Sequence, residues 1–223
     1  MTASITEDLV LLLLDPGSGR SVVDSMSLDR AIGGALLLDL STRERLAADG
    51  EGAKARLTVA DSAPTDDPLL DEALARLSGK PVRAQKAVER LAKGTRMPVL
   101  ERLVERGLIR RTKSSLFGLF PVTTWPPADP APRAELQRRV AAVLRDGEKP
   151  DQHVALLISL LHAVKAEHKI VDGNRRELRA RSKQVAAGDW AGPAVLKAVQ
   201  AVHASVMAAV TAATTAGAAS SGG

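Results

Sequence analysis

Apolar residues recur at helical spacing along most of this chain. The first run, Leu9 to Leu14, follows Ser4-Ile5-Thr6-Glu7, which has the spacing of a capping box, so we predict a buried helix from Ser4 to Leu14. The same periodicity predicts further helices at residues 28–40, 69–77, 82–92, 98–106, 133–145, 154–171, 178–185 and 194–210. Helices therefore account for most of the expected structure.

Two stretches depart from the helical pattern. Residues 53–59 alternate weakly, which favours a short strand, and residues 108–112 and 117–122 are β-like, with Lys113-Ser114-Ser115 between them. We therefore predict a mainly α fold class, a single compact helical domain over residues 1–210 with helices around a buried central helix and one small β-hairpin. An Ala/Thr/Ser/Gly tail at 211–223 is expected to be disordered.

Aromatic residues are concentrated around the predicted hairpin. The chain has four of them, and three lie between Leu116 and Pro126: Phe117, Phe120 and Trp125. The segment directly follows the basic residues Arg110, Arg111 and Lys113. Apolar side chains beside cations indicate a surface for an anionic and partly apolar partner, which leaves three alternatives: a membrane, the protein's own body or a second copy, or a nucleic acid.

Composition narrows the class of protein. The net charge of +5 favours anionic partners, and the absence of cysteine excludes disulfides and thiolate metal sites. The longest apolar run, Leu9–Leu14, is far shorter than the roughly 20 residues that span a bilayer. Without a basic segment before that run, the N-terminus does not resemble a signal peptide. We expect a soluble, cytoplasmic protein that at most lies on a membrane surface.

Catalytic and metal-binding motifs are absent from the sequence. None of the four histidines forms a HExxH motif, and no glycine-rich phosphate loop or nucleophile elbow is present. The acidic stretch at residues 61–72 fits helix capping better than metal binding, because Asp67 before Pro68 has the pattern of an N-cap. We predict no enzyme, no cofactor and no metal site.

Two other patterns bear on function. Gly33-Gly34 inside a predicted helix indicates close helix packing in preference to close approach by a ligand. The helix from Pro98 followed by a hairpin has the layout of a winged helix, which binds nucleic acid. That helix carries Glu101 and Glu105, which phosphates would repel, so nucleic acid is the least favoured of the three partners.

Several segments resemble blocks of the Golgi phosphoprotein 3 family, in the family's order and over most of residues 4–210. The longest is Asp-Ser-Ala-Pro-Thr-Asp-Asp-Pro-Leu-Leu-Asp-Glu-Ala-Leu at residues 61–74. Shorter ones lie at residues 6–12, 34–46 and 103–109, the last followed by the predicted hairpin. The shortness of the chain and its Ala- and Arg-rich composition indicate a compact bacterial member.

The resemblance implies a peripheral membrane adaptor that binds the headgroup of phosphatidylinositol 4-phosphate on a basic face. The family's headgroup pocket uses one tryptophan and three arginines. Two of those arginines fall at Lys93 and Arg96, whereas the first falls at Gly33 and the tryptophan near Asp24. Arg30, one turn before Gly33, is the expected substitute.

The resemblance also assigns the hairpin. In the family, the hairpin supports oligomerisation, and apolar side chains beside the pocket enter the bilayer. The corresponding residues here are Leu116, Phe117, Leu119 and Phe120. The expected partners are therefore an anionic phospholipid headgroup and a second copy of the chain.

Overall fold

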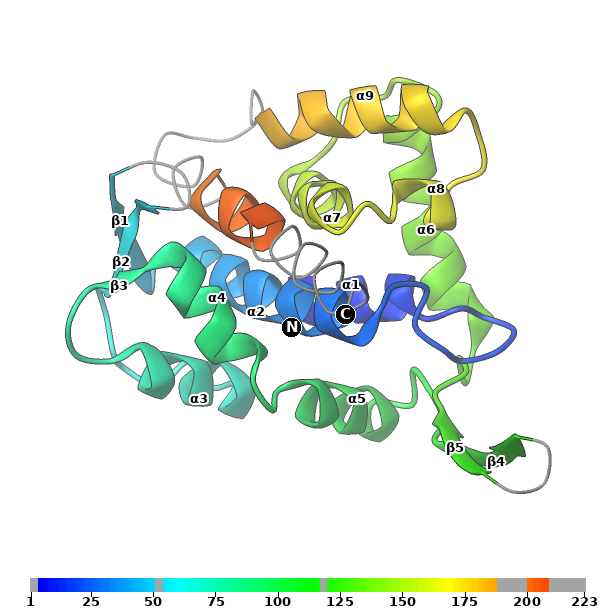
Figure 1. The fold of residues 1–223 in the computed structure, drawn as a ribbon, viewed down its shortest axis with the longest axis horizontal. Coiled ribbons are helices and arrows are strands. Elements are labelled where there is room, and N and C mark those ends of the chain that lie inside the picture. The colour runs from blue at the N-terminus through cyan, green and yellow to red at the C-terminus, as the bar shows by residue number, and fades with distance from the viewer. Residues whose placement is uncertain (1–3, 51–53, 117–119, 188–199, 209–223) are drawn as a thin grey trace, which may run out of the picture.

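Helices form most of this computed structural model, which describes residues 4–50, 54–116, 120–187 and 200–208 (Figure 1). The helices are α1 (Ile5–Leu13), α2 (Ser25–Thr42), α3 (Pro68–Leu77), α4 (Ala84–Ala92), α5 (Arg96–Glu105), α6 (Pro130–Leu144), α7 (Gln152–Ala163), α8 (Glu167–Ile170) and α9 (Arg175–Ala187), and residues 200–208 are also helical. The strands are β1 (Leu46–Asp49), β2 (Arg56–Val59), β3 (Val82–Arg83), β4 (Thr112–Leu116) and β5 (Phe120–Thr124). The predicted mainly α fold class is confirmed.

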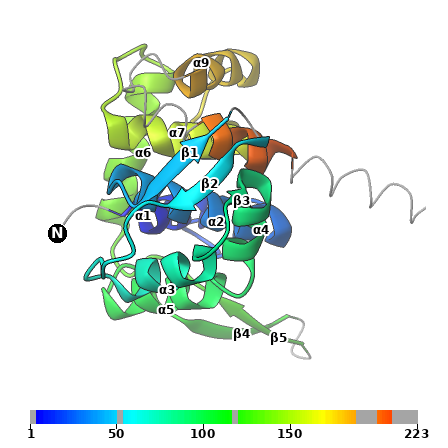
Figure 2. The ribbon, with the colours of Figure 1, turned by 90° about the vertical axis from the view of Figure 1, so that its left-hand side faces the viewer.

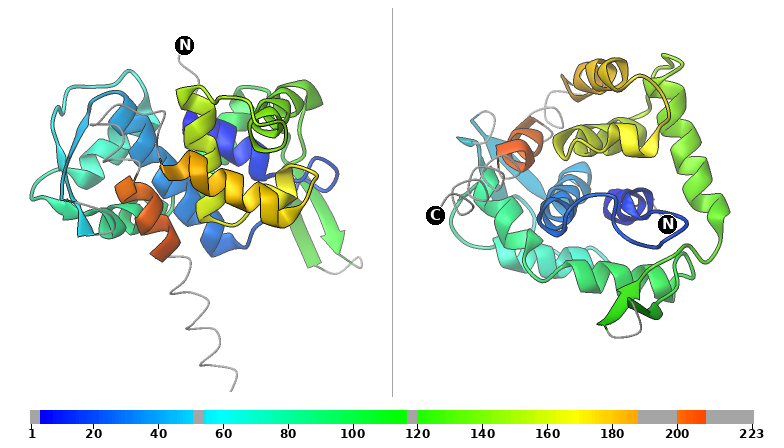
Figure 3. Two further views of the ribbon diagram at one scale, coloured as in Figure 1. Left: turned by 90° about the horizontal axis from the view of Figure 1, so that it is seen from above. Right: turned by 45° about the vertical axis from the view of Figure 1, so that its right-hand side comes forward.

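Two helices, α1 and α2, occupy the centre of the fold. The right-hand view of Figure 3 shows them side by side, with α4 and α5 below them, α6 to one side and α7 above. Nearly every residue of α1 is buried, as its run of apolar residues predicts, and ten consecutive residues of α2, from Ala31 to Leu40, are buried too. The predicted buried central helix is thus a central pair.

A buried carboxylate joins the two central helices. Asp39 on α2 is 1% exposed and accepts hydrogen bonds from the backbone N–H groups of Ile5 and Thr6, each at 3.0 Å. The hydroxyl groups of Ser4 and Thr6 donate to the same carboxylate at 3.1 and 2.7 Å. Asp39 therefore stabilises the free N–H groups at the start of α1, where the helix dipole favours a negative charge.

Gly33 and Gly34 are explained by packing. A Cβ atom on Gly33 would lie 2.5 Å from the carbonyl oxygen of Val88 on α4, so the backbones of α2 and α4 are in contact there. A Cβ atom on Gly34 would lie 2.7 Å from Val206, in the helical residues 200–208. The prediction of close helix packing at this pair is confirmed.

The strands form two separate antiparallel sheets (Figure 2). In the first, β2 pairs with both β1 and β3, so only the strand predicted at residues 53–59 was anticipated from the pattern. The second is the predicted hairpin of β4 and β5, in which Leu116 pairs with Phe120. The prediction placed its turn at Lys113-Ser114-Ser115; this is wrong, because those residues belong to β4.

The helix predicted at residues 154–171 is two helices in the structure. The break follows α7 at Lys165, whose φ of 56° lies in the left-handed region and ends the helix. After the break, Glu167 turns back to His162, with 2.7 Å between its Oε1 and the histidine Nδ1. The helix predicted at 194–210 is described only at residues 200–208, and the predicted tail at 211–223 lies outside the described residues.

A buried polar cluster ties the last four helical segments together. The histidine Nδ1 of His162 on α7 lies 2.8 Å from Ser182 Oγ on α9, and that hydroxyl donates to Glu167 Oε1 at 2.9 Å. The ring of His162 also stacks on His203, with 5.4 Å between ring centroids. Burial and the neighbouring His162 lower the pKa of His203 to about 4, so His203 is neutral at physiological pH.

Acid is expected to destabilise the protein through His203. Its pKa is lower in the folded chain than the ordinary value near 6.5, so its contribution to stability is present above about pH 6.5 and is lost as pH falls through about 4. Between neutral pH and about pH 4.5 we expect His203 to account for a loss of about 2–3 kcal/mol in the free energy of unfolding.

Urea denaturation at both pH values, for the wild type and His203→Leu, measures this contribution. The variant keeps an apolar side chain in the buried place and cannot take up a proton. We expect the variant to lose less stability on acidification than the wild type. Equal losses in the two proteins would show that His203 does not carry the effect.

Candidate functional site

Arg96 lies at the N-terminal end of α2 in the fold, although it begins α5. Its Nε donates to the Asp29 carboxylate at 2.7 Å, and its Nη2 donates to the backbone oxygen of Ser25 at 2.5 Å. The side chain is 29% exposed, and its remaining terminal nitrogen has no partner among the described residues. Arg96 therefore links α5 to α2 and still presents part of its guanidinium to solvent.

Lys93 is held beside Arg96 by the turn between α4 and α5. Gly94 takes a φ of 76°, a left-handed conformation that favours glycine, and thereby brings the two basic residues together. Arg76 on α3 supports this turn, because its Nη1 donates to the Lys93 carbonyl oxygen at 2.7 Å and to Thr95 Oγ1 at 3.2 Å. Lys93 itself is exposed, so its ammonium group is free to meet an anion in solution.

Two exposed methionines flank these basic residues. Met26 in the first turn of α2 is 49% exposed, and Met97 in the first turn of α5 is 40% exposed. Among the residues whose side-chain exposure the structure describes, which leaves out residues 114–121, they are the only large hydrophobic residues that are exposed. Met26 follows Ser25 in the chain and Met97 follows Arg96, and the Arg96 guanidinium donates to the Ser25 backbone oxygen. We call the surface formed by Met26, Lys93, Arg96 and Met97 the α2 edge.

Arg30 lies on the same part of α2. It is half-buried and follows Asp29, the partner of Arg96. The close contact of Gly33 with α4 brings Lys93, the residue after Ala92, to the same helix. Arg96 and Arg30 therefore lie at or near the first turns of α2, and Lys93 follows the residue that packs against Gly33. Their predicted role in headgroup binding stays a prediction.

The hairpin residues are only partly described. The backbones of Leu116 and Phe120 pair in the ladder, whereas Phe117 and Leu119 lie outside the described residues. Trp125, expected to lie on the same surface, is 8% exposed and belongs to the core. Its backbone N–H donates to the carbonyl oxygen of Gly19 at 2.8 Å, so a loop far away in sequence covers it, and that expectation is wrong.

The guanidinium of Arg111 lies over the indole ring of Trp125. Its guanidinium carbon lies 5.6 Å from the centroid of the indole ring, a cation–π distance. The base of the hairpin is thus anchored by the tryptophan, while the strands themselves project away from the helices (Figure 1). Of the aromatic segment noted in the sequence, only the part beyond this base remains a candidate surface.

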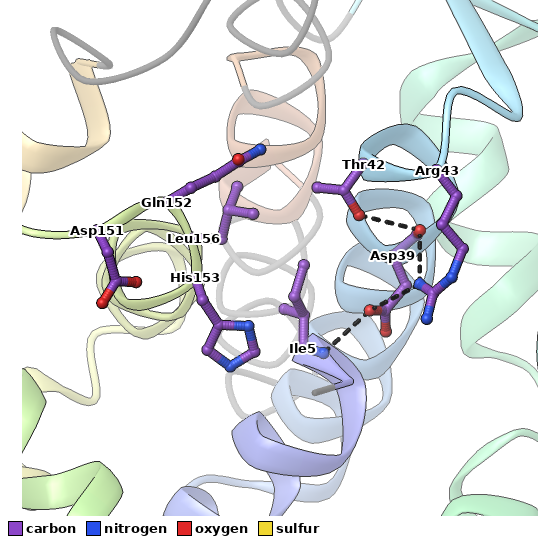
Figure 4. Close-up of a pocket in the computed structure, with 8 residues that line it drawn as sticks. All are labelled: Ile5, Asp39, Thr42, Arg43, Asp151, Gln152, His153 and Leu156. Carbon is purple, nitrogen blue, oxygen red and sulfur yellow. Dashed lines mark hydrogen bonds and ion pairs between the residues drawn. The ribbon is translucent and has the colours of Figure 1, made fainter. Parts of the chain in front are cut away.

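A cavity of about 460 Å³ lies at the opposite end of α2 (Figure 4). Its lining comes from the starts of α1 and α7 and the end of α2: Ile5, Asp39, Thr42, Arg43, Asp151, Gln152, His153 and Leu156. Most of its polar groups already have structural partners. Asp39 holds α1, Asp151 caps α7 through Val154 N–H at 3.0 Å, and His153 Nε2 lies 2.8 Å from Asp8.

A second hollow, of about 500 Å³, runs between α3 and α5 and is largely acidic. Its lining includes Glu72, Glu101 and Glu105, together with Pro68 and Pro98. Arg102 and Arg106 also line it, but both are ion-paired with the buried Glu7. Because α5 carries Glu101 and Glu105 on the side that lines this hollow, the helix preceding the hairpin is poorly suited to a phosphate backbone. This argues against nucleic-acid binding.

The acidic stretch at residues 61–72 is used for structure. Asp67 caps α3 through Leu69 N–H at 3.0 Å and pairs with Arg102, and Asp71 accepts from the Thr65 hydroxyl at 2.6 Å. Over the residues that the structure describes, no three His, Asp or Glu side chains gather in a way that could hold a metal ion. Within the same residues, no helix is both long and apolar enough to cross a membrane.

Comparison with known proteins identifies the family. The model of the family described as Golgi phosphoprotein 3 (GPP34) matches residues 5–202, which is most of the chain. The chain belongs to the Golgi phosphoprotein 3 (GPP34) family. Proteins of this family are non-enzymatic adaptors, so the prediction that the chain is not an enzyme is confirmed.

One curated relative supports this assignment. The chain is 26% identical over 172 residues to "Vacuolar protein sorting-associated protein 74" of Eremothecium gossypii, an alignment that covers 64% of this chain. The chain spans about half the length of that relative, 49%. The predicted bacterial origin of this GPP34-family chain stays a prediction.

Two positions differ from the pocket that the family resemblance implies. At Gly33, where an arginine was expected, the backbone of α4 leaves no room for a side chain. Near Asp24, where a tryptophan was expected, the carboxylate caps α2 by accepting from Ser27 N–H at 2.9 Å. Met26 and Met97 were not predicted from the sequence, because the apolar residues that stand out beside cations there are the aromatic ones.

Proposed function

We propose that this GPP34-family protein is an adaptor that binds anionic lipid headgroups at a bilayer surface through the α2 edge. The observation that carries the proposal is the position of the two exposed methionines: Met97 follows Arg96 in the chain, and Met26 follows Ser25, whose backbone oxygen accepts from Arg96. Apolar side chains that enter the interface beside cations that meet phosphates are the combination used by peripheral membrane proteins. The family's association with phosphatidylinositol 4-phosphate supports the same ligand class.

Charge is expected to dominate recognition over shape in this chain. Lys93 replaces a planar guanidinium with a point charge, so it cannot hold a phosphate by a two-pronged contact. Arg96 already spends two of its nitrogens on Asp29 and Ser25. We therefore infer that phosphatidylinositol 4-phosphate is bound as one of several anionic lipids, without a strong preference.

Lipid binding should fall when either component of the α2 edge is removed. Replacing Lys93 with glutamine removes one surface charge, which is worth about 1 kcal/mol near an anionic bilayer, or about fivefold in affinity. The double change Met26→Ser and Met97→Ser removes the apolar contacts and should cost about tenfold or more. Co-sedimentation with phosphatidylcholine vesicles, with and without phosphatidylserine or phosphatidylinositol 4-phosphate, measures both effects.

Lys149→Gln is the matched control. Lys149 is exposed and lies two residues before Asp151, which caps α7 at the opposite end of α2. The variant loses the same charge as Lys93→Gln, but at a position away from the α2 edge, so it should bind like the wild type. Added salt should weaken the binding of every protein in the series. A wild-type protein that does not bind phosphoinositide-containing vesicles at low salt would rule out the proposal.

A second candidate function is self-association through the hairpin. The sheet of β4 and β5 has two strands in the described structure, and the outer edges of such a small sheet favour pairing with another chain. Phe117→Ser separates the two functions when both vesicle binding and elution from a sizing column are measured. If the hairpin serves self-association alone, the variant will elute as a monomer from a sizing column and bind lipid normally.

A further inference from the structure

A second cation contacts the chain just before α2. Lys169 on α8 donates from its Nζ to the backbone oxygen of Val22 at 2.6 Å. Arg96 on α5 donates to the backbone oxygen of Ser25, three residues later. Cations from two helices that are far apart in sequence therefore bracket the short segment that leads into α2, and the exposed Met26 follows directly after it.

Further basic residues lie beside Lys169. His168 is next in the chain, and burial together with the charges of Arg175 and Lys169 lowers its pKa below the ordinary value. After burial, the charges of Arg175 and Lys169 are the next causes of the lowered pKa, so both cations lie close enough to His168 to act on it. Arg175 is exposed at the start of α9, and neither it nor Lys169 has a carboxylate within ion-pair distance among residues 4–50, 54–116, 120–187 and 200–208.

The acids near this cluster do not neutralise it. Glu167 is 2% exposed, and its carboxylate bonds to His162 and Ser182 in the interior. Arg179 reaches that carboxylate only at 3.9 Å. Asp172 and Glu177 are exposed, and the charge of Asp172 also acts on Arg145 at the end of α6. Asp24 is exposed within the bracketed segment, but its carboxylate accepts from the N–H and hydroxyl groups of Ser27 as the cap of α2. Lys169 and Arg175 therefore leave a positive excess on this surface.

We propose that the membrane contact of the α2 edge continues onto α8, where Lys169 is a second headgroup contact near Arg96. The inference rests on the proposed function and adds to it the number of lipids bound. A protein held at these two points engages at least two anionic headgroups of one bilayer. The partner is therefore the charged lipid surface, in contrast to one headgroup in a closed pocket.

Two-point contact has a measurable signature. Affinity should rise more steeply than linearly with the fraction of phosphatidylserine in the vesicle, because both contacts need an anionic lipid. A soluble inositol phosphate should compete poorly, since it can fill one contact without bridging to the other. A single-headgroup site would give a linear rise and full competition.

Lys169→Gln tests the second contact directly. Glutamine removes the charge but keeps an N–H donor for the Val22 carbonyl, so the variant is expected to unfold at the wild-type temperature. We expect about fivefold weaker binding to phosphatidylserine vesicles, and a dependence on phosphatidylserine content that becomes close to linear. Lys149→Gln, with the same loss of charge at the far end of α2, should bind like the wild type.

The outcomes separate this inference from the proposed function. If Lys93→Gln weakens binding and Lys169→Gln does not, the contact at α8 is refuted while the α2 edge stands. If the soluble inositol phosphate displaces the wild type completely, the protein has a single-headgroup site and the inference is again refuted. If the wild type binds no anionic vesicle at all, the proposed function itself is refuted.

Discussion

Gly33→Arg should unfold the protein and restore no headgroup contact. The family resemblance places a pocket arginine at this position, so the substitution is the obvious attempt to rebuild the pocket. The structure forbids it, because a Cβ atom at Gly33 would lie 2.5 Å from Val88 O and 2.9 Å from Ala92 N, both backbone atoms of α4. Relief requires α2 and α4 to separate, which we expect to cost about 3 kcal/mol or more.

Gly33→Ala isolates the steric term, since it adds the Cβ atom alone. In an unhindered helix this change would stabilise by about 1 kcal/mol, so a loss of stability would come from the contact with α4. The matched control is Gly17→Ala, because a Cβ atom there would come no closer than 3.7 Å to Asp15. Urea denaturation of both variants measures the difference, and a Gly33→Ala protein as stable as the wild type would contradict the packing argument.

Asp39→Ala should be equally damaging. Asp39 is 1% exposed and receives four hydrogen bonds from Ser4, Ile5 and Thr6, and Arg43 lies 3.4 Å from the same carboxylate. Alanine would leave the buried N–H groups at the start of α1 without acceptors. We expect the free energy of unfolding to fall by about 3–5 kcal/mol, the range for breaking a buried charged network.

Two further substitutions define the cause of that loss. Asp39→Asn keeps the volume and one acceptor oxygen, so its cost should lie between those of the wild type and the alanine variant. Asp49→Ala removes an exposed carboxylate at the end of β1 and should change stability by no more than about 0.5 kcal/mol. Thermal or urea unfolding of the three variants checks the order, and an Asp39→Ala protein within 1 kcal/mol of Asp49→Ala would contradict it.

Helix starts could be predicted because their signals are local. Ser4 accepts from Glu7 N–H at 3.4 Å as a cap, and Asp67 before Pro68 opens α3 as expected. The start of α5 was misplaced by two residues, because Pro98 is a strong local signal although the helix already begins at Arg96. Its end was correct, since Gly107 takes the left-handed φ of 69° that a C′ glycine supplies.

Features set by distant contacts could not be predicted. The strands β1 and β3 are two to four residues long and exist only by pairing with β2, so no periodicity marks them. The break at Lys165 lacks a nearby glycine or proline and depends on contacts with α9. Trp125 is buried by a loop more than 100 residues away, which local composition does not show.

The candidate site divides in the same way. Lys93, Arg96 and Arg30 could be named from the family resemblance, and their role in headgroup binding stays a prediction. Met26 and Met97 could not be recognised, because each looks like an ordinary residue of a helix start until the fold places both beside Arg96. The role proposed for Lys169 depends on a contact with Val22, 147 positions away in the chain.

The way the hairpin is attached bears on how the protein can diversify. Its base is fixed by two backbone hydrogen bonds of 2.8 Å, from Trp125 N–H to the Gly19 carbonyl oxygen and from Arg110 N–H to the Pro126 carbonyl oxygen. Its two strands form a sheet of their own. Sequence changes in the strands beyond this base leave the central helix pair and the α2 edge untouched. Selection can therefore exchange one hairpin for another, and so alter the proposed self-association, at little cost to folding or to the proposed lipid-facing surface.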